Sequence, residues 1–290
     1  LKGAFIMTVL VAADLSARSA NALSRACQVA QSLGDDVTAL HVVDRNLPDD
    51  FRQQSVDWAK KNLQGVINEV SCASDVKVTA DVRQASPRKC IIERANAEGV
   101  SLLVFGVHDG GDDEKSFSQT TAGRALAGSV PPALLVTKKP DEDYRNVVVG
   151  IDFTMSSRAA IRQALAIAPE AKIHLVHAYH PPFIGLSASP GLAEEVAYQH
   201  KLEFDKFLNE EMALLQDQAK GMGAVADNIH RVIKPGAPQS VLKQACKDAN
   251  ADLLVIATQG RGVISRAIWG SVAADMLDNP PCDVLVIKPF

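Results

Sequence analysis

A glycine-rich stretch near the C-terminal end carries the residues best suited to hold an anion. Gly260 follows the apolar run 253–256, and Gly270 and Ser271 open the next helical pattern. A buried strand, a glycine loop and a helix N-terminus together present bare backbone N–H groups and the positive end of a helix dipole. Arg261 and the Ser271 hydroxyl can add charge-assisted hydrogen bonds. The pattern predicts a phosphate site, although an ordinary strand-to-helix turn would use similar residues.

A carboxylate supplies the second candidate. Asp152 ends the apolar run 147–151, and a helical pattern follows from near Ser156. In an open parallel sheet, ligands bind beyond the carboxyl ends of the strands, where a carboxylate can hold a base edge or a ribose hydroxyl. The competing interpretation is that Asp152 caps the following helix. We favour the ligand because Asp152 lies in the same half of the chain as the glycine stretch.

Other chemistry finds little support among the residues. Cys90 and Cys246 lie in helical patterns with no base nearby in sequence, and no Gly-x-Ser-x-Gly or Gly-Lys-Ser/Thr motif occurs. His174, His177 and His180 are three apart, so one strand cannot aim all of them at the same metal ion. The sequence therefore predicts no catalytic residue and no metal site.

Composition excludes several classes of protein. The chain has 290 residues, of which 47% are hydrophobic and 22% charged, with a net charge of −4. No basic field exists to attract nucleic acid or an anionic membrane, and no run of about 20 apolar residues could span a bilayer. The five cysteines are scattered and odd in number, which argues against a disulfide framework or a zinc site and for a reducing compartment. The apolar run 4–13 after Lys2 is a little like a signal peptide, but the repeat described next favours a first strand. We expect a cytoplasmic protein.

The chain repeats itself. Five sequence landmarks occur twice in the same order. The pairs are 9–14 with 147–152, 40–44 with 176–180, 85–87 with 236–238, 101–106 with 252–257, and 131–138 with 280–288. Two copies of one domain, 4–139 and 145–290, are predicted, joined by the short charged linker 140–144.

Each copy alternates strands with helices, which predicts an α/β fold: a Rossmann-like, five-stranded parallel sheet with helices on both faces. A long connection follows the second strand of each copy, and in the second copy it reads as a helix over 192–219. The copies differ at the anion loop. In the first copy Asp109 stands where Gly260 stands in the second, and four carboxylates within 109–114 would repel phosphate. We expect only the second copy to keep the site.

The spacing of the glycines resembles the nucleotide motif of the universal stress proteins. That motif is glycine, two residues, glycine, nine residues, glycine, then serine or threonine. Here Ala257 replaces the first glycine, while Gly260, Gly270 and Ser271 match. The resemblance covers essentially the whole chain, twice, and the arrangement looks like the tandem, E-type members.

The resemblance implies an adenine nucleotide site in the second copy. Its residues would be Asp152, Ala178, Ile256, Ala257, Gly260, Arg261, Gly270, Ser271 and Val272. Degenerate counterparts in the first copy are Asp14, Val42 and Gly106. The implied cofactor is ATP or AMP, with Mg²⁺ possible beside ATP and none strictly required.

A nucleotide-responsive stress-response module with an unknown protein partner is the function that the resemblance implies. Ligand-dependent ordering of the loop 258–269 would change the surface that this partner reads. Two alternatives stay open: a slow ATPase that uses Arg261 and Mg²⁺, and a carrier or scaffold that no longer binds nucleotide. The last strands, Leu134–Lys138 and Val284–Lys288, are expected to pair within the chain as a pseudo-dimer, and a further homodimer is possible.

Overall fold

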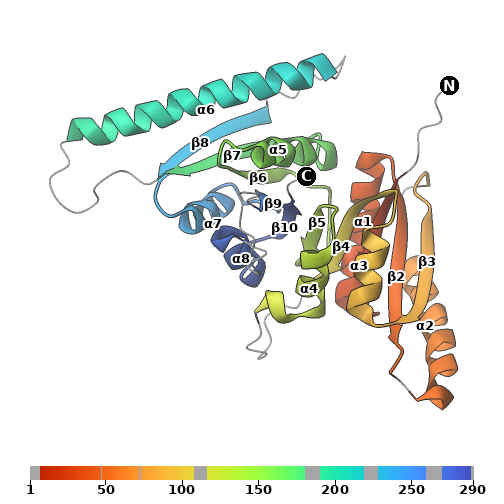
Figure 1. Ribbon diagram of the computed structural model, residues 1–290. Coiled ribbons are helices and arrows are strands. Elements are labelled where there is room, and N and C mark those ends of the chain that lie inside the picture. The colour runs from red at the N-terminus through yellow and green to blue at the C-terminus, as the bar shows by residue number, and fades with distance from the viewer. Residues whose placement is uncertain are drawn as a thin grey trace.

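The computed structural model describes residues 7–46, 48–70, 72, 74–107, 116–179, 190–218, 228–258 and 270–288 (Figure 1). The first half comprises β1 (Thr8–Ala12), α1 (Ala17–Leu33), β2 (Asp36–Asp44), α2 (Asp49–Glu69), β3 (Val78–Ala85), α3 (Pro87–Ala95), β4 (Val100–Gly106), the 3₁₀ turn η1 (Phe117–Gln119), α4 (Thr121–Gly128) and β5 (Ala133–Val136). The second half comprises β6 (Asn146–Ile151), α5 (Met155–Ile167), β7 (Lys172–Tyr179), α6 (Pro190–Gln218), β8 (Ile229–Pro235), α7 (Pro238–Asp248), β9 (Leu253–Ala257), α8 (Ser271–Asp278) and β10 (Asp283–Ile287).

The strands form one sheet of ten, in the order β3-β2-β1-β4-β5-β10-β9-β6-β7-β8. Read outward from the middle, the two halves have the same strand order, which confirms the α/β fold that the repeat predicts. Pairs within each half are parallel, and β5 and β10 join the halves as antiparallel neighbours with Leu134 opposite Leu285. The pseudo-dimer pairing expected of the last strands is therefore present within one chain.

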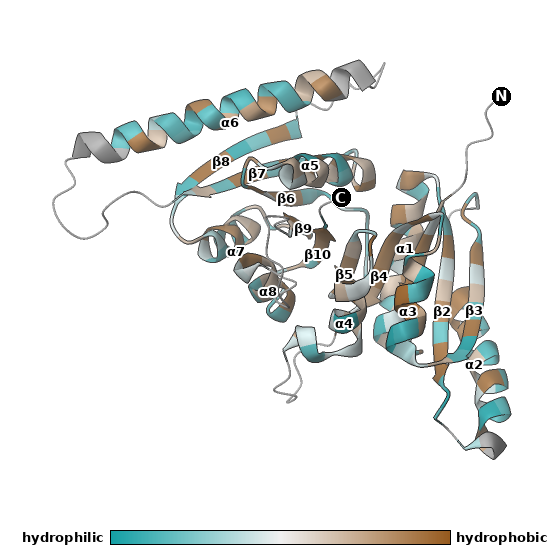
Figure 2. Cartoon of the chain, in the orientation of Figure 1, coloured by the Kyte–Doolittle hydropathy of each residue, from teal (hydrophilic) through white to brown (hydrophobic). Residues whose placement is uncertain are grey.

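Apolar side chains on the two faces of the sheet form two core layers. One layer packs beneath α1 and α5, and the other packs beneath α3, α4, α7 and α8. The central strands β4, β5, β9 and β10 are mainly brown in Figure 2, whereas the outer helices carry long teal stretches. Strands buried on both faces are continuous apolar runs, and such runs in the sequence located them.

A buried polar cluster fixes the seam between the halves. The carboxylate of Asp283, 1% exposed, accepts hydrogen bonds from the Thr137 amide (2.8 Å) and the Tyr144 hydroxyl (2.8 Å). Arg25 of α1 lies 3.4 Å from the same carboxylate and 4.0 Å above the Tyr144 ring. Burial raises the pKa of Tyr144 well above its usual value, and the neighbouring Asp283 charge adds to this. The cluster joins α1, the linker and β10.

Two further contacts tie the second half to the end of the first. The Lys288 ammonium follows β10 and donates to the carbonyl oxygens of Leu126 and Ser129 at the C-terminal end of α4. Burial lowers the pKa of Lys288 to about 8. The Asp278 carboxylate at the end of α8 accepts from the Phe117 amide at 2.7 Å. The carbonyls at the end of α4 and the first amide of η1 are thus satisfied by residues of the second half.

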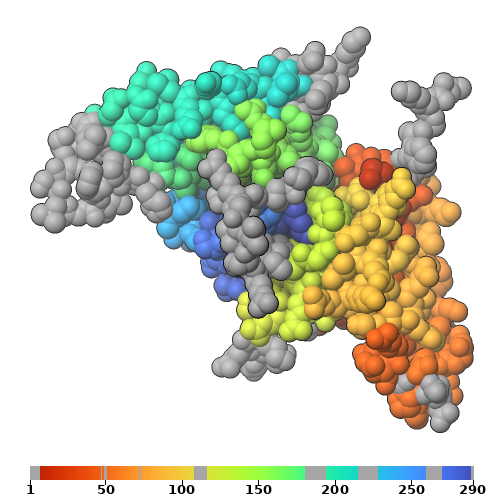
Figure 3. Space-filling model, viewed as in Figure 1, coloured from red at the N-terminus to blue at the C-terminus, as the bar shows by residue number. Residues whose placement is uncertain are grey.

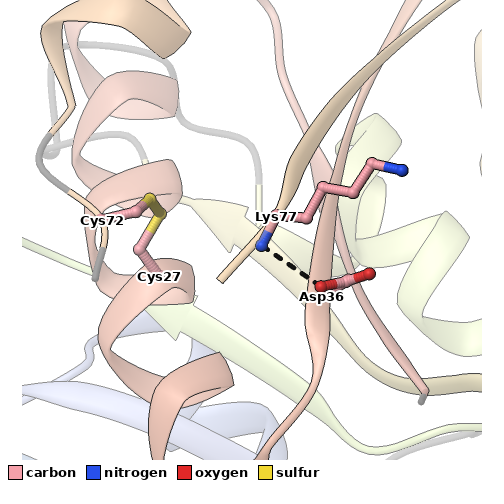
Figure 4. The surroundings of a disulfide bond; sticks show 4 residues. All are labelled: Cys27, Asp36, Cys72 and Lys77. Carbon is pink, nitrogen blue, oxygen red and sulfur yellow. Dashed lines mark hydrogen bonds between the residues drawn. A yellow bond between two sulfur atoms is a disulfide. The ribbon is translucent and has the colours of Figure 1, made fainter. Parts of the chain in front are cut away.

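One sequence expectation about cysteine is wrong. Cys27 of α1 and Cys72, which follows α2, form a disulfide with Cα atoms 5.2 Å apart (Figure 4). The two lie 45 residues apart in the sequence, and this spacing does not reveal that the segment after α2 comes to lie against α1. The remaining cysteines, Cys90, Cys246 and Cys282, are free and buried.

Candidate functional site

A cavity of about 240 Å³ opens at the carboxyl ends of β6, β7 and β9, beside the N-termini of α7 and α8. Its walls are Gly150, Ile151, Asp152, Ser157, Val176, His177, Ala178, Pro238, Leu242, Ile256, Ala257, Gly270, Ser271, Val272 and Ala273. This is the edge of a parallel sheet at which ligands bind in open α/β folds.

The structure brings most of the sequence candidates together. Seven of the nine line this one cavity: Asp152, Ala178, Ile256, Ala257, Gly270, Ser271 and Val272. The other two, Gly260 and Arg261, lie outside the described residues, as do the loop 259–269 and the acidic stretch 109–114 of the first half. Residues from four separate segments of the chain therefore meet at one place.

The N-cap of α5 is Thr154, whose side chain accepts from the Ser157 amide, so Asp152 does not cap the helix itself and lines the cavity beside it. Its Oδ1 accepts hydrogen bonds from the Thr154 amide (3.1 Å), the Thr154 hydroxyl (2.5 Å) and the Ser157 hydroxyl (2.5 Å). Phe153, between them, has a φ of 61°, a left-handed conformation that non-glycine residues seldom adopt. The turn holds the carboxylate in a fixed place at the end of β6.

Ser157 is a site residue that the sequence reasoning missed. It is fully buried, and its Oγ accepts from the Asp152 amide at 2.9 Å while its hydroxyl donates to the carboxylate. A signal was present, because the spacing Asp-x-Ser/Thr-x-x-Ser occurs in both halves, with Asp14, Ser16 and Ser19 in the first. The apolar walls Pro238, Leu242 and Val176 were also missed, because such side chains look like ordinary core.

The helix end opposite Asp152 is built differently. Gly270 occupies the N-cap position of α8 with φ −61° and ψ 157°, and it has no side chain to cap the helix. The first N–H groups of a helix lack intrahelical partners and need a side chain, water or a ligand. Ser271 follows, and its hydroxyl oxygen accepts from the side-chain Nε2 of Gln239, at the start of α7, at 3.4 Å. This end of the cavity suits an anion.

The first half lacks this arrangement. Thr120 takes the position of Gly270 at the start of α4, and its hydroxyl oxygen accepts from the Gly123 amide at 3.0 Å. At Gly106, the counterpart of Ala257, an added Cβ would lie 2.5 Å from the Arg18 carbonyl oxygen, so α1 packs tightly over the end of β4. Where the second half has an uncapped helix start, the first half has a capped one.

Asp14, the counterpart of Asp152, is also engaged. Its Oδ1 accepts from the Ser16 amide (3.0 Å) and the Ser16 hydroxyl (2.5 Å). Burial works to raise the pKa of Asp14, but hydrogen bonds from Ser16 and Ser19 outweigh it and lower the pKa below its usual value. Val42, the counterpart of Ala178, is larger than the alanine and packs against the core. The first half therefore keeps the turn around Asp14 but lacks an uncapped helix start that could hold an anion.

The chemistry of the cavity favours binding over reaction. Its described walls combine apolar side chains with the Asp152 carboxylate, the His177 imidazole, the Ser157 and Ser271 hydroxyls and the start of α8. Within the described ranges no three His, Cys, Asp or Glu side chains are grouped to hold a metal ion. His174 and His177 lie on opposite faces of β7, as the strand period predicts, and His180 is outside the described residues.

Comparison with known proteins decides the family. Residues 6–136 and 143–288 each match the Universal stress protein family. The chain belongs to the universal stress protein family. It carries two such domains in tandem, in agreement with the internal repeat.

Several known proteins are similar to this universal stress protein, and the first of them shares its fold. A universal stress protein from Archaeoglobus fulgidus superposes with a TM-score of 0.66 at 18% identity, over 97% of this chain and 98% of that one. A universal stress protein of Methanocaldococcus jannaschii is 29% identical over 148 residues, which are 50% of this chain and 82% of the relative. A universal stress protein in complex with cAMP is 27% identical over 50% of this chain and 98% of its own, with a TM-score of 0.34.

In the described part of the chain, no helix is long and apolar enough to cross a membrane.

Proposed function

We propose that this universal stress protein binds one adenine nucleotide, ATP or AMP, in the cavity of its second half and acts as a nucleotide-responsive regulatory or interaction module. The observation that carries the proposal is the meeting of Asp152 and the uncapped start of α8 across one apolar cavity. A nucleotide has the same order of parts: a flat apolar base, a ribose with hydroxyl donors, and an anionic phosphate chain.

Each wall has a role in this proposal. The base lies between Ala178 and Ile256, whose small or apolar side chains leave room for a flat ring. The carboxylate of Asp152 accepts from a ribose hydroxyl. The backbone amides at Gly270 and Ser271 hold the phosphates, and Gly260 and Arg261 extend that cradle. Mg²⁺ accompanies ATP through the phosphate oxygens, with no protein ligand assigned to it.

We favour binding without efficient turnover, because the imidazole among the described wall residues, His177, is already engaged with the Ile151 carbonyl through Nδ1 and with His200 through Nε2. Two other universal stress proteins have been solved with cAMP or AMP bound. Each of those two structures matches half of this chain, and the proposal rests on the cavity and the glycine motif.

Paired variants at equivalent positions test the proposal. Isothermal titration calorimetry of the full chain with adenosine, AMP and ATP, with and without Mg²⁺, should detect binding. Ala178→Phe, which fills the cavity from β7, should weaken every ligand by at least about tenfold, the equivalent of 1.4 kcal/mol. Val42→Phe, the matched change in the first half, should leave affinity unchanged. Failure of the wild type to bind any of the three ligands would favour the carrier or scaffold alternative, and steady phosphate release from ATP would favour the ATPase.

A further inference from the structure

The floor of the cavity continues into the long helix α6. Phe153, which follows Asp152, stacks on His177 of β7 with ring centroids 4.2 Å apart. The same ring meets the edges of Phe204 and Phe207 of α6 at 5.8 and 5.5 Å. In the space-filling view α6 lies directly against the green residues of β7 and α5 (Figure 3). A movement of α6 would therefore disturb the turn that holds Asp152.

Two histidines form the polar contact between α6 and this floor. His177 is 7% exposed, and its Nδ1 lies 2.9 Å from the Ile151 carbonyl oxygen. Its Nε2 lies 3.2 Å from Nδ1 of His200 on α6. A carbonyl only accepts, so Nδ1 of His177 carries the proton and its Nε2 offers a lone pair. His200 must then donate from Nδ1, which it does both as a neutral ring and as an imidazolium.

The proton count of this pair is limited by its geometry. One extra proton on His200 leaves the hydrogen bond intact. A second, taken from solvent onto Nε2 of His177, places two N–H donors and two positive charges face to face, with ring centroids 5.2 Å apart. The bond then breaks, and the rings separate or lose their proton.

The surroundings determine when this happens. Tyr179 of β7 stacks on His200 at 4.7 Å, and the charges of Asp152 at the end of β6 and Glu203 of α6 also act on His177. Burial lowers the pKa of His177; the Ile151 carbonyl raises it, a charge on His200 lowers it, and the two carboxylates raise it. The net shift is downward, so the closed pair resists the second proton.

The first half provides an internal comparison. His41 of β2 contacts the Ala13 carbonyl at 2.8 Å, as His177 contacts Ile151. There, α2 brings Val56 and Ala59 to the equivalent turn at Leu15, where α6 brings its histidine and aromatic residues. The histidine pair is thus confined to the half that carries the cavity.

Farther along, α6 is anchored independently of the histidines. The fully buried Glu211 accepts from Arg162 at 2.6 Å and from Arg158 at 3.2 Å, both on α5. This anchor holds the C-terminal part of α6 while the part that carries His200 separates from β7.

We propose that His177 and His200 form a proton-operated latch, which closes α6 onto the floor of the nucleotide cavity near neutral pH and opens it on acidification, weakening nucleotide binding. This inference rests on the proposed function. Because the pKa of His177 is lowered in the closed state, the latch contributes fully above the ordinary histidine value of about 6.5 and is lost as pH falls below it. A nucleotide that needs the closed floor is correspondingly released in acid.

Calorimetry with adenosine tests the coupling, because adenosine has no phosphate that titrates in this range. From pH 7.5 to 5.5, the affinity of the full chain should fall steadily, by no more than about tenfold per pH unit, which is the limit for uptake of one proton. His200→Gln keeps a neutral donor toward His177 and should reduce this dependence, and His177→Gln should abolish it. His230→Gln, on the opposite face of the sheet and stacked on His174 at 5.1 Å, should behave as the wild type.

A second measurement does not need a ligand. Long-range ¹H–¹⁵N spectra of the histidines should show His177 as the Nδ1–H tautomer at pH 7.5. Amide hydrogen exchange in the part of α6 around His200, corrected for intrinsic rates, should accelerate at pH 5.5 while exchange around Glu211 stays slow. Unchanged adenosine affinity and unchanged exchange across this range would overturn the latch. Acid-accelerated exchange in a protein that binds no adenosine at any pH would support the latch and refute the nucleotide site.

Discussion

Replacing Gly270 by threonine should move stability and phosphate binding in opposite directions. The backbone at Gly270 (φ −61°, ψ 157°) suits any residue, and an added Cβ would have no heavy atom of the described structure within 4 Å. Threonine at this N-cap can accept from the first turn of α8, as Thr120 does in α4. The free energy of unfolding should therefore stay unchanged or rise by a few tenths of a kcal/mol.

Affinity for phosphate should fall in the same variant. The threonine hydroxyl satisfies an amide that the phosphate would use, and its β-branched side chain occupies the approach to the helix end. Losing one or two charge-assisted contacts at about 1.5–3 kcal/mol each weakens binding roughly 10- to 100-fold or more. The loss should increase from adenosine to AMP to ATP, as titration calorimetry of the three ligands would show.

Two controls separate the causes of this loss. Gly270→Val has the same shape without the hydroxyl, so it should weaken ATP binding without the gain in stability. Thr120→Gly removes the cap in the first half and should cost a few tenths of a kcal/mol without changing affinity. Equal losses for adenosine and ATP in Gly270→Thr would refute the reasoning, because the segment would then shape the whole cavity and not hold phosphate.

Two stability predictions concern the joints of the molecule. Asp283→Ala removes the partner of the buried Arg25 and should lower the free energy of unfolding by about 3–5 kcal/mol in urea titrations. Asp283→Asn should cause a smaller loss. A loss below about 1 kcal/mol for Asp283→Ala would mean that the seam is held by β5–β10 pairing alone. Reduction of the Cys27–Cys72 disulfide by a dithiol, which opens a connection of 45 residues, should lower the free energy of unfolding of the wild type by about 2–4 kcal/mol. The variant Cys72→Ala should be unaffected by the dithiol. Equal sensitivity of that variant would point to another thiol.

Local pattern was enough to predict most of the fold. The run 253–256 became β9, the last strand ends at Ile287, and the helix expected over 192–219 is α6, Pro190–Gln218. Within that helix Phe204 is fully buried, whereas Leu214 is 46% exposed. Periodicity finds a helix more reliably than it says how much of its apolar face a neighbour covers.

The resemblance to the universal stress proteins predicted how the halves join, through pairing of their last strands β5 and β10. It also located the cavity, since strand ends and helix starts of one half must meet at one edge of the sheet. What escaped was contact between distant side chains. Neither the Cys27–Cys72 bridge nor the His177–His200 contact has a local signature, since each depends on how a helix packs over the sheet.

Ser157 shows a different limit. Its role follows from a spacing repeated in both halves, yet the same Asp-to-Ser turn serves as a helix cap in the first half. Sequence therefore identifies the turn, and only the cavity beside it separates a ligand site from a plain cap.

The number of nucleotides bound by each chain tests the account most directly. Native mass spectrometry of the full chain with ATP should show one nucleotide per chain, still present in Val42→Phe and absent in Ala178→Phe. Two nucleotides per chain, or one that survives Ala178→Phe, would contradict a single site in the second half.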